Sequence, residues 1–558
     1  MSSGMKKGSE IIIDVLQEEG VDVLFGFPGG QVIPLYDALY DCPIRHILTR
    51  HEQGAAHAAD GYARVTGKVG VCIATSGPGA TNLVTGLANA YMDSVPMVAI
   101  TGQVPTSMIG NDSFQEADIY GISIPITKYN YLVKDIHDLG RVLKEAFYLA
   151  RTGRPGPVLV DVPRDIQVGQ IKYKPITEIY LPSYHPVIKG HPKQIETALK
   201  AIREAERPVA YVGGGIISAG ATEELQAFIR ATNLPITNTL LGKGSFPEDH
   251  PLSLGMLGMH GSRYANYSIY NSDLIVALGV RFDDRVAGDV AKFAPRARVI
   301  HVDIDPAEIG KRVNVDIPIV GDVKTVLGQL LAKVKPMERK KWLEQINQWK
   351  KDHPLTYKKD GGLKPQYILE CINTLKKREV IIGTDVGQHQ MWAAQFIRTK
   401  KPRTFISSGG LGTMGYGFPA SIGAQVGCPE KTVILISGDG SFQMNIQELA
   451  TARCYNIPVK IFIFNNGYLG MVRQWQELFW NKRYSHTHFE FNPDFVKVAE
   501  GYEIKGRVVR TTEEVMPAIE AALSVKEPYL IDFRIAPEEN VSPMVPPGKG
   551  ICEILEEC

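Results

Sequence analysis

Short runs of apolar, often β-branched residues recur along the whole chain, and each run ends in a glycine-rich or polar turn followed by a helical pattern. This alternation is typical of α/β layers, because a strand that lies parallel to the previous one is reached through a crossover helix. The runs are apolar throughout, as expected for buried strands. The sequence therefore predicts an α/β fold with doubly wound parallel sheets.

The runs fall into three blocks, as expected for 558 residues, a length that one hydrophobic core rarely serves. A proline-containing segment, residues 171–192, follows the first block and is predicted to be a surface linker. A charged segment, residues 335–365, follows the second. The predicted domains are residues 1–175, 190–335 and 365–558. The predicted strands lie in "VDVLFGFPGG", "VGVCIATSGPGATN", "VPMVAITGQVP" and "GPVLVDVP", then "PVAYVGGGI", "DLIVALGVRFDDR", "ARVIHVDIDP" and "IPIVGD", then "EVIIGTDVG", "TVILISGDGSFQ", "VKIFIFNNG" and "PYLIDFRI".

Charge and cysteine content exclude several classes of protein. Lys and Arg total 61 against 60 Asp and Glu, so no basic field is available for nucleic acid or anionic lipid. No apolar run approaches the roughly 18 residues of a membrane span, and charges interrupt the N-terminal segment where a signal peptide would be apolar. The seven scattered cysteines contain no Cys-x-x-Cys pair, so we expect reduced thiols, each a small buried hydrophobe, in a cytoplasmic protein.

The strongest chemical motif lies in the third block, where two successive predicted strands end in polar residues. One strand ends at Gly438-Asp439-Gly440 and the next at Asn465-Asn466. Ligands of parallel sheets bind beyond the carboxyl ends of the strands, so we expect Asp439 and Asn466 side by side at one edge. A carboxylate and an amide carbonyl suit Mg²⁺ that is completed by phosphate oxygens and water. Either half alone is also an ordinary turn sequence, and only the pairing favours a site for Mg²⁺ and a phosphate-bearing ligand.

This pairing resembles the diphosphate and Mg²⁺ motif of thiamine diphosphate (ThDP) enzymes, and the resemblance extends over nearly the whole chain. Within that group the chain is most similar to the catalytic (large) subunits of acetohydroxyacid synthase, also called acetolactate synthase. Members of that family have three α/β domains that bind the pyrimidine, FAD and the diphosphate in that order. The segments that carry the resemblance are "FGFPGG", "HEQGAAHAADGYAR", "TSGPGATN", "TGQVPTSMIGNDSFQEAD", "GRPGPVLVDVP", "GMLGMHG", "RFDDRVAG", "GQHQMWAAQ", "GGLGTMGYGFPA", "NNGYLGMVRQW" and "RYSHTH".

Glu52 stands at the head of a segment made mostly of Gly and Ala. In ThDP enzymes a glutamate at this motif position donates a hydrogen bond to N1′ of the aminopyrimidine, so the resemblance assigns this role to Glu52. Donation requires a retained proton, and desolvation among Gly54, Ala55 and Ala56 is expected to raise the pKa of the carboxyl. The small residues are also expected to admit another backbone, from a second subunit. The alternative is a capping glutamate on an ordinary helix.

The resemblance places most ThDP contacts in the third block. Tyr468 stands where the family supplies a third Mg²⁺ ligand, after Asp439 and Asn466, through a main-chain carbonyl. Met414 is expected to hold the cofactor in its bent conformation, although an isolated Met is more often core filler. The remaining matched positions are Gly387, Gln388, His389, Gly412, Gly438, Gly440, Ser441, Gly470 and Met471.

Other matched positions surround the reaction centre. Phe114 and Gln115 belong to a segment near that centre, and Arg164 replaces a commoner Lys at the entrance, which leaves affinity for substrate or inhibitors open. Trp475 is expected to shape the pocket for the second keto acid; the alternative is a buried core Trp. Gln31 follows "FPGG" where many relatives have a smaller residue.

The middle block matches the segments that contact FAD in the family. A lone glycine-rich turn is weak support for a nucleotide, but "RFDDR" is not expected in flavin-free acetolactate synthases. The positions that the resemblance assigns to FAD are Arg154, Gly213, Gly214, Thr239, Leu240, Met259, His260, Gly279, Arg281, Asp283, Arg285, Asp303, Ile304 and Asp322.

The resemblance therefore implies an acetolactate synthase that decarboxylates pyruvate on ThDP, with Mg²⁺ and FAD as further cofactors. The two-carbon unit passes to a second pyruvate or to 2-ketobutyrate, in the first common step of branched-chain amino acid synthesis. The expected assembly is a homodimer or homotetramer with active sites between subunits, with a possible small regulatory subunit. Two alternatives remain: a pyruvate oxidase that passes electrons to FAD, and a catalytically silent flavin-binding paralogue.

Overall fold

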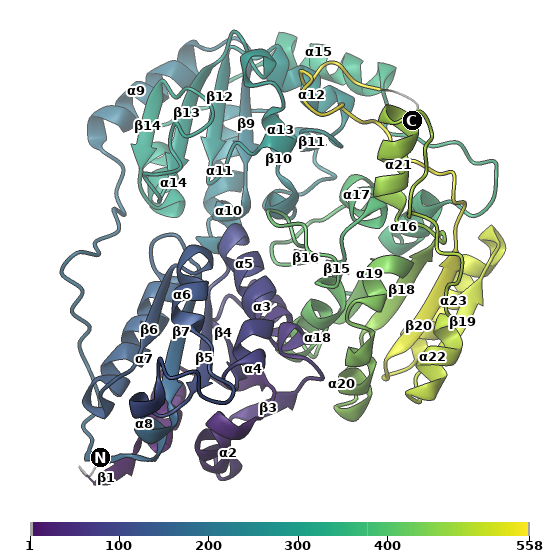
Figure 1. The fold of residues 1–558 in the computed structure, drawn as a ribbon. Coiled ribbons are helices and arrows are strands. Elements are labelled where there is room, and N and C mark those ends of the chain that lie inside the picture. Colours follow the sequence, from purple (N-terminus) through teal and green to yellow (C-terminus); the bar gives the residue numbers. More distant parts are fainter. Residues whose placement is uncertain (1–3, 376–377, 556–558) are drawn as a thin grey trace.

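The computed structural model describes residues 4–375 and 378–555, and it contains three α/β domains, each built on a six-stranded parallel sheet (Figure 1). In Figure 1 the first domain is purple to blue, the middle domain is teal and lies above it, and the green to yellow third domain lies at their side. The predicted α/β class with parallel sheets is confirmed.

The first domain has the strand order β3-β2-β4-β5-β7-β6. Its N-terminus is tied to the end of the domain by a short antiparallel pair, β1 (Met5–Lys7) with β8 (Gln170–Lys172). The strands of the sheet are β2 (Val23–Gly26), β3 (Arg45–Leu48), β4 (Gly70–Ala74), β5 (Met97–Gln103), β6 (Tyr129–Leu132) and β7 (Pro157–Pro163). The α-helices are α1 (Gly8–Glu18), α2 (Ile33–Tyr40), α3 (Glu52–Thr66), α4 (Pro78–Asn82), α5 (Val84–Asp93), α6 (Ile119–Ser123), α7 (Ile136–Arg151) and α8 (Arg164–Val168).

The middle domain has the order β11-β10-β9-β12-β13-β14. Its strands are β9 (Pro208–Val212), β10 (Ile236–Asn238), β11 (Ser253–Met256), β12 (Leu274–Leu278), β13 (Arg298–Asp303) and β14 (Ile317–Val320). Its α-helices are α9 (Pro192–Glu204), α10 (Gly214–Ser218), α11 (Thr222–Thr232), α12 (Arg263–Tyr270), α13 (Asp284–Ala287), α14 (Val323–Leu331) and α15 (Lys340–Asp352), and a 3₁₀ turn, η4 (Leu240–Gly242), follows β10.

The third domain has the order β16-β15-β17-β18-β20-β19. Its strands are β15 (Val380–Thr384), β16 (Phe405–Ile406), β17 (Thr432–Gly438), β18 (Lys460–Asn465), β19 (Lys505–Val509) and β20 (Tyr529–Arg534). Its α-helices are α16 (Pro365–Asn373), α17 (Gln388–Phe396), α18 (Gly417–Gly427), α19 (Asp439–Gln443), α20 (Leu449–Cys454), α21 (Gly470–Phe479), α22 (Phe495–Gly501) and α23 (Thr512–Ser524).

Each sheet is buried on both faces, which explains why its strands are apolar throughout rather than alternating. In β4, Val71 and Ile73 join one hydrophobic core while Cys72 and Ala74 join the core on the opposite face. Strands β12 and β18 divide their residues between two cores in the same way. Helices therefore cover both faces, and the strand ends remain available for ligands.

The two segments between the predicted blocks differ from each other. Residues 173–191 contain no helix or strand and run from the first domain to the middle domain, as predicted for a linker (Figure 1). The charged segment instead forms α15, because Trp342 and Ile346 recur at helical spacing and are buried in the core of the middle domain.

The segment after β20 first packs within the third domain, through Ile535 and Val541, and then packs on the middle domain. The main-chain N–H of Val545 donates to Met259 O at 2.8 Å, and the amide of Asn266 donates to Ile551 O at 3.0 Å. Ile551 is buried in the core beside α15. The predicted third domain, residues 365–558, thus ends in a tail that is anchored in its own core by Val541 and then packs on the middle domain.

Helix α3 is packed against α18 of the same chain, which corrects one expectation. We expected its small residues to admit the backbone of a second subunit. A Cβ on Gly61 would lie 2.0 Å from Ala420 O, and one on Gly423 would lie 1.8 Å from Ala58 O. The close approach therefore joins the first and third domains of one chain, and the glycines are required because two helix backbones touch.

Six cysteines lie in the described part of the chain and all are free, whereas Cys558 lies outside it. Cys72, Cys371 and Cys428 are buried as expected, but Cys454 at the end of α20 is exposed, so the expectation of a buried hydrophobe is wrong for that residue. No helix among the described residues is both long and apolar enough to cross a membrane.

Candidate cofactor and active site

The two polar strand ends of the third domain lie side by side. Strands β17 and β18 pair in parallel with Gly438 opposite Phe464, so both end at the same edge of the sheet. The N–H of Gly467 donates to Asp439 Oδ2 at 3.1 Å, and the side-chain amide of Asn492 donates to the same oxygen at 2.7 Å. The predicted juxtaposition of the two motifs is therefore present in the fold.

Burial raises the pKa of Asp439 to about 6, although the hydrogen bond from Asn492 opposes the shift. The side chain is almost fully enclosed. Because desolvation disfavours its charged form, a cation beside the carboxylate would restore that form. The site therefore favours a bound positive ion.

Asn466 and Tyr468 continue the site along the loop after β18. The amide of Asn466 donates to Gln388 Oε1 at 3.3 Å, and its own carbonyl accepts the N–H of Tyr468 at 3.0 Å. A Cβ on Gly470 would lie 2.1 Å from Gln388 Oε1, so a larger residue where α21 begins would displace the Gln388 side chain. These contacts bring the matched segments around residues 388, 439 and 466 together.

The oxygen donors fit Mg²⁺ only with help from a ligand. Within residues 4–375 and 378–555 no group of three or more His, Cys, Asp or Glu side chains could hold a metal ion. One carboxylate, one amide oxygen and a main-chain carbonyl suit a hard cation whose other ligands are diphosphate oxygens and water.

His389 presents an unpartnered polar atom at this edge. Its Nε2 is buried without a hydrogen-bond partner, and burial lowers the pKa of the ring to about 3, so the imidazole is neutral. A Cβ on Gly438 would lie 2.8 Å from the ring Nδ1, and Gly387 has φ 150°, so glycines keep the backbone close to the ring. Ser441 instead donates its hydroxyl to Val386 O at 2.8 Å, on the same side of the site. An orphaned buried nitrogen fits a site that a polar ligand completes.

A cavity of about 870 Å³ adjoins these residues where the three domains meet. The third domain contributes Gly387, Gly412, Met414, Met471 and Trp475 to its wall, and the first domain contributes Met92, Asp93 and Ser94. Every position that the resemblance assigned to FAD lines this one cavity: Arg154, Gly213, Gly214, Thr239, Leu240, Met259, His260, Gly279, Arg281, Asp283, Arg285, Asp303, Ile304 and Asp322.

Strand ends of the middle domain shape the cavity floor. A Cβ on Gly213 would lie 2.3 Å from Gly279 O, so glycine is needed where the turns after the paired strands β9 and β12 touch. His260 has a buried Nδ1 without a partner, and burial lowers the pKa of its ring to about 4. Asp303 has a pKa that burial raises to about 6. These polar groups fit a cavity that holds a ligand with polar functions.

Trp475 lies in α21 beside the same cavity. The guanidinium of Arg285 lies 5.5 Å from the centre of the indole, and Phe479 packs edge-on against it with a centroid distance of 6.1 Å. The indole Nε1 is buried without a partner. The alternative of a core Trp is thus not met, since the side chain lines a cavity.

The predicted catalytic residues of the first domain lie apart from this cavity, unlike the flavin-matched Arg154. Glu52 is buried and accepts a hydrogen bond from the Asn82 amide at 2.9 Å, within its own domain. Phe114 is 85 % exposed, Gln115 has φ 59°, and Arg164 is exposed. None of these four predicted residues lines the cavity described above.

Sequence analysis missed several residues that shape the site. Asn492 binds Asp439, and Asp93 accepts the N–H groups of Gly409 and Gly410 in the cavity wall at 2.9 and 2.7 Å. Asn82 belongs to the segment "TSGPGATN", which carries part of the family resemblance, so the sequence could have indicated this residue. Asp93 and Asn492 stand in no motif, and only the contacts between segments reveal them.

Comparison with known proteins agrees with this geometry. Three family models match: thiamine pyrophosphate enzyme N-terminal TPP binding domain over residues 6–122, central domain over 195–330, and C-terminal TPP binding domain over 385–533. A probable acetolactate synthase large subunit of Methanocaldococcus jannaschii is 53% identical over 99% of this chain and 95% of its own. The chain belongs to the acetolactate synthase large-subunit family of thiamine pyrophosphate enzymes.

Other members of the acetolactate synthase family are similar over comparable lengths. The acetolactate synthase large subunit of Corynebacterium glutamicum is 51% identical over 98% of this chain and 90% of its own, and the acetolactate synthase of Arthrospira platensis is 51% identical over 98% and 97%. The TPP-binding matches in the first and third domains support thiamine diphosphate as a cofactor. The family resemblance stated from the sequence is confirmed.

Proposed function

We propose that the protein is an acetolactate synthase that decarboxylates pyruvate and joins the two-carbon unit to a second 2-keto acid. The products are 2-acetolactate from pyruvate and 2-aceto-2-hydroxybutyrate from 2-ketobutyrate, in the first common step of branched-chain amino acid synthesis, in the cytoplasm. The observation that carries the proposal is the meeting of the Asp439–Asn466 edge with a cavity lined by all the flavin-matched residues. Relatives about half identical over nearly the whole chain bear the same enzyme's name.

The third domain holds the diphosphate end of ThDP in this proposal. Asp439, Asn466 and the carbonyl of Tyr468 hold Mg²⁺, while the segment of Gly387, Gln388 and His389 contacts the diphosphate, and Gln388 also holds the amide of Asn466 in place through its side-chain oxygen. The glycines at 387, 438, 440 and 470 let the backbone approach the phosphates. When bound, ThDP supplies the electron sink that allows a 2-keto acid to lose CO₂.

Glu52 supplies the acid proton in the first domain. Its carboxyl donates to N1′ of the aminopyrimidine, and Asn82 holds its second oxygen in place. Phe114 and Gln115 lie near the reaction centre, Arg164 receives the substrate carboxylate at the entrance, and Trp475 contacts the second keto acid. Met414, in the cavity wall, supports the bent cofactor.

The middle domain binds FAD without a redox role, because joining two keto acids moves no net electrons. A pyruvate oxidase would have the same layout, so the test is to replace FAD with the redox-inactive 5-deaza analogue. Acetolactate formation should persist. Turnover that vanishes although the analogue binds and the fold persists would favour the oxidase.

The active unit is a homodimer or homotetramer with sites between subunits, to which a small regulatory subunit binds. This part of the proposal is supported by the position of Glu52, which is bonded within its own domain and does not line the cavity where the flavin-matched positions meet Met414 and Trp475. Apolar side chains remain uncovered on the same chain, among them Phe114, Met444, Trp480 and Phe491.

A direct assay tests the proposal. Purified protein should form acetolactate from pyruvate when ThDP, Mg²⁺ and FAD are all supplied, and removal of ThDP or Mg²⁺ should abolish the product. Asp439→Ala should weaken the apparent affinities for ThDP and Mg²⁺ together, because it removes the only charged ligand. Cofactor titrations that are unchanged in this variant would contradict the assigned metal site, and a silent protein with bound cofactors would contradict the enzyme.

A further inference from the structure

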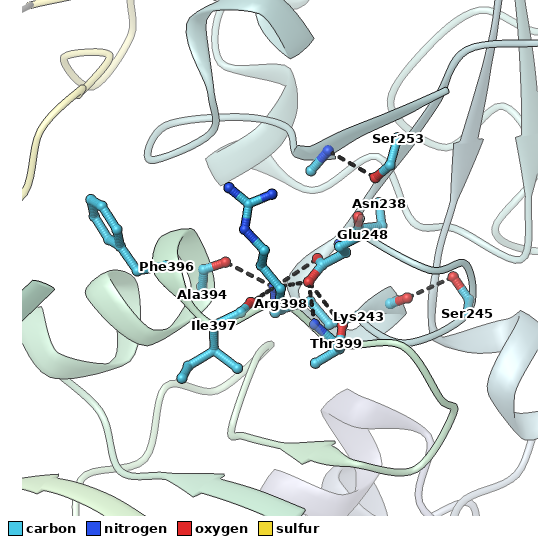
Figure 2. Close-up of polar contacts among 12 residues, drawn as sticks. Asn238, Lys243, Ser245, Glu248, Ser253, Ala394, Phe396, Ile397, Arg398 and Thr399 are labelled. Carbon is cyan, nitrogen blue, oxygen red and sulfur yellow. Dashed lines mark hydrogen bonds and ion pairs between the residues drawn. The ribbon is translucent and has the colours of Figure 1, made fainter. Parts of the chain in front are cut away.

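A buried ion pair joins the middle domain to the third domain (Figure 2). The side chain of Lys243 is 2% exposed, and its ammonium donates to the two carboxylate oxygens of Glu248 at 2.7 and 2.9 Å. It also donates to the main-chain carbonyls of Ala394 and Ile397 at 2.9 and 3.1 Å. Glu248 in turn accepts the N–H of Thr399 at 2.7 Å and its hydroxyl at 2.9 Å. Every bond of the Lys243–Glu248 pair to the third domain thus falls at the C-terminal end of α17.

A cation stabilises the C-terminal end of α17. The last carbonyls of a helix lack intrahelical donors and carry the negative end of its dipole, so a cation there is favourable. A buried ion pair contributes little net stability compared with apolar residues of the same size, because both charges are desolvated. What the pair supplies is geometry: four acceptors around one ammonium fix the helix end in one position.

Both segments that this contact joins continue into residues that line the cavity. Lys243 follows η4, and the preceding residues Thr239, Leu240 and Leu241 line the flavin-matched wall. Helix α17 starts after Gly387, which lines the same cavity together with Gln390. The helix has nine residues, so a displacement of its C-terminal end is carried to its N-terminal end.

A second close contact keeps the same segments together. Gly244 has φ 86°, and a Cβ there would lie 2.3 Å from Lys401 O, so the loop after Lys243 touches the backbone of the third domain. The segment that lines the flavin-matched wall and helix α17 are therefore held together at one contact. The Lys243–Glu248 pair is the polar centre of this contact.

We propose that Lys243 and Glu248 are positioning residues that couple the two cofactor sites, so that FAD in the middle domain raises the affinity of the third domain for ThDP. By linkage, ThDP raises the affinity for FAD by the same factor. The inference rests on the proposed function, because it takes FAD and ThDP as the ligands of the two walls.

The test measures binding without substrate. The dissociation constant of ThDP, with Mg²⁺ present, is determined by calorimetry with and without saturating FAD in wild type and in Lys243→Met. This substitution keeps an unbranched side chain that is one atom shorter and removes the charge. We expect FAD to tighten ThDP binding at least about fivefold in wild type, a usual size for coupled sites, and less than about twofold in Lys243→Met.

Lys400→Met is the matched control. Lys400 pairs with Asp249, so this ion pair joins the same two segments, but its side chains are 63% and 47% exposed. Exposed pairs contribute little, so the wild-type coupling should persist in this control. The double variant Lys243→Met/Glu248→Gln leaves no unpaired buried carboxylate. It replaces the single variant in the experiment if Lys243→Met fails to fold, and it should also lose the coupling between FAD and ThDP binding.

The possible outcomes distinguish the coupling proposed here from the proposed function. If the Lys243 variants melt at a lower temperature but keep the coupling of wild type, the Lys243–Glu248 pair has only a structural role, and the inference is overturned. Independent binding of the two cofactors by wild type would overturn it as well, while the proposed function stands. Wild-type protein that bound neither cofactor would overturn the proposed function and this inference together.

Discussion

Under the proposed function, we expect Trp475 to set the choice between pyruvate and 2-ketobutyrate as the second keto acid. Its indole presents a large apolar surface to the cavity, and the guanidinium of Arg285 lies over the ring. The two acceptors, pyruvate and 2-ketobutyrate, differ by one methylene, which is worth about 1 to 1.4 kcal/mol in a fitted apolar pocket, or roughly fivefold to tenfold in rate. Discrimination of this size needs no polar contact.

Trp475→Leu should therefore reduce the preference for 2-ketobutyrate over pyruvate by up to about tenfold. The measurement supplies both keto acids and follows the ratio of acetohydroxybutyrate to acetolactate at several concentrations. Phe479→Leu is the control, because Phe479 packs on the indole but does not line the cavity. A Trp475→Leu product ratio equal to that of wild type would make Trp475 a packing residue.

Glu52→Gln keeps the shape of the side chain but cannot deliver an acid proton. The rate of acetolactate formation should fall at least about 100-fold, within the usual range for general acid and base groups, while ThDP still binds. Steady-state kinetics at saturating ThDP, together with a binding titration, check both parts. Turnover near that of wild type would remove Glu52 from the mechanism.

At the scale of elements, the strands that the sequence located are mostly the central ones. In the first and third domains all four predicted strands occupy the middle of the sheet, whereas the missed strands β3, β6, β16 and β19 are its edges. Edge strands are buried less completely, so they lack the continuous apolar run of a central strand. In the middle domain β10 and β11 were missed at one edge, where β10 has only three residues.

The contact between α3 and α18 gives a prediction at the same scale. Gly423→Ala would place a Cβ 1.8 Å from Ala58 O, and because both atoms belong to helix backbones, neither can turn away. We expect a loss of about 1–3 kcal/mol or more, the cost of overpacking, seen as a lower melting temperature.

Gly328→Ala is the matched control for this substitution. Gly328 also lies inside a helix, α14, but nothing lies within 4 Å of the added Cβ. Alanine should there be neutral or stabilise by up to about 1 kcal/mol, because it reduces the entropy of the unfolded chain. Equal melting temperatures for the two variants would mean that α3 and α18 separate at little cost.

At the scale of the whole molecule, the site depends on contacts that no single segment encodes. The adjacency of Asp439 and Asn466 could be predicted, because neighbouring parallel strands end at one edge. The bond from Asn492 to Asp439 and the docking of the C-terminal tail on the middle domain could not, because they join segments far apart in the chain without a local pattern. The cavity itself is formed by residues of all three domains.

The position of Glu52 gives the prediction for the assembly. Its hydrogen bond is to Asn82 of its own domain, and it does not line the cavity that adjoins the Asp439 edge. In a symmetric dimer with the site between subunits, Glu52 of one chain serves the Asp439 edge of the other. Glu52→Gln and Asp439→Ala should each inactivate the enzyme when alone.

Mixing these two inactive variants should restore activity. After dissociation and random reassociation, half of the dimers contain one chain of each kind, and each such dimer has one site with both residues intact, so the mixture should recover about a quarter of wild-type activity per chain. The measurement is acetolactate formation as a function of the mixing ratio, with a maximum at equal amounts. If Glu52 and Asp439 of the same chain formed the site, every site would carry one of the two substitutions, and no mixing ratio would restore activity.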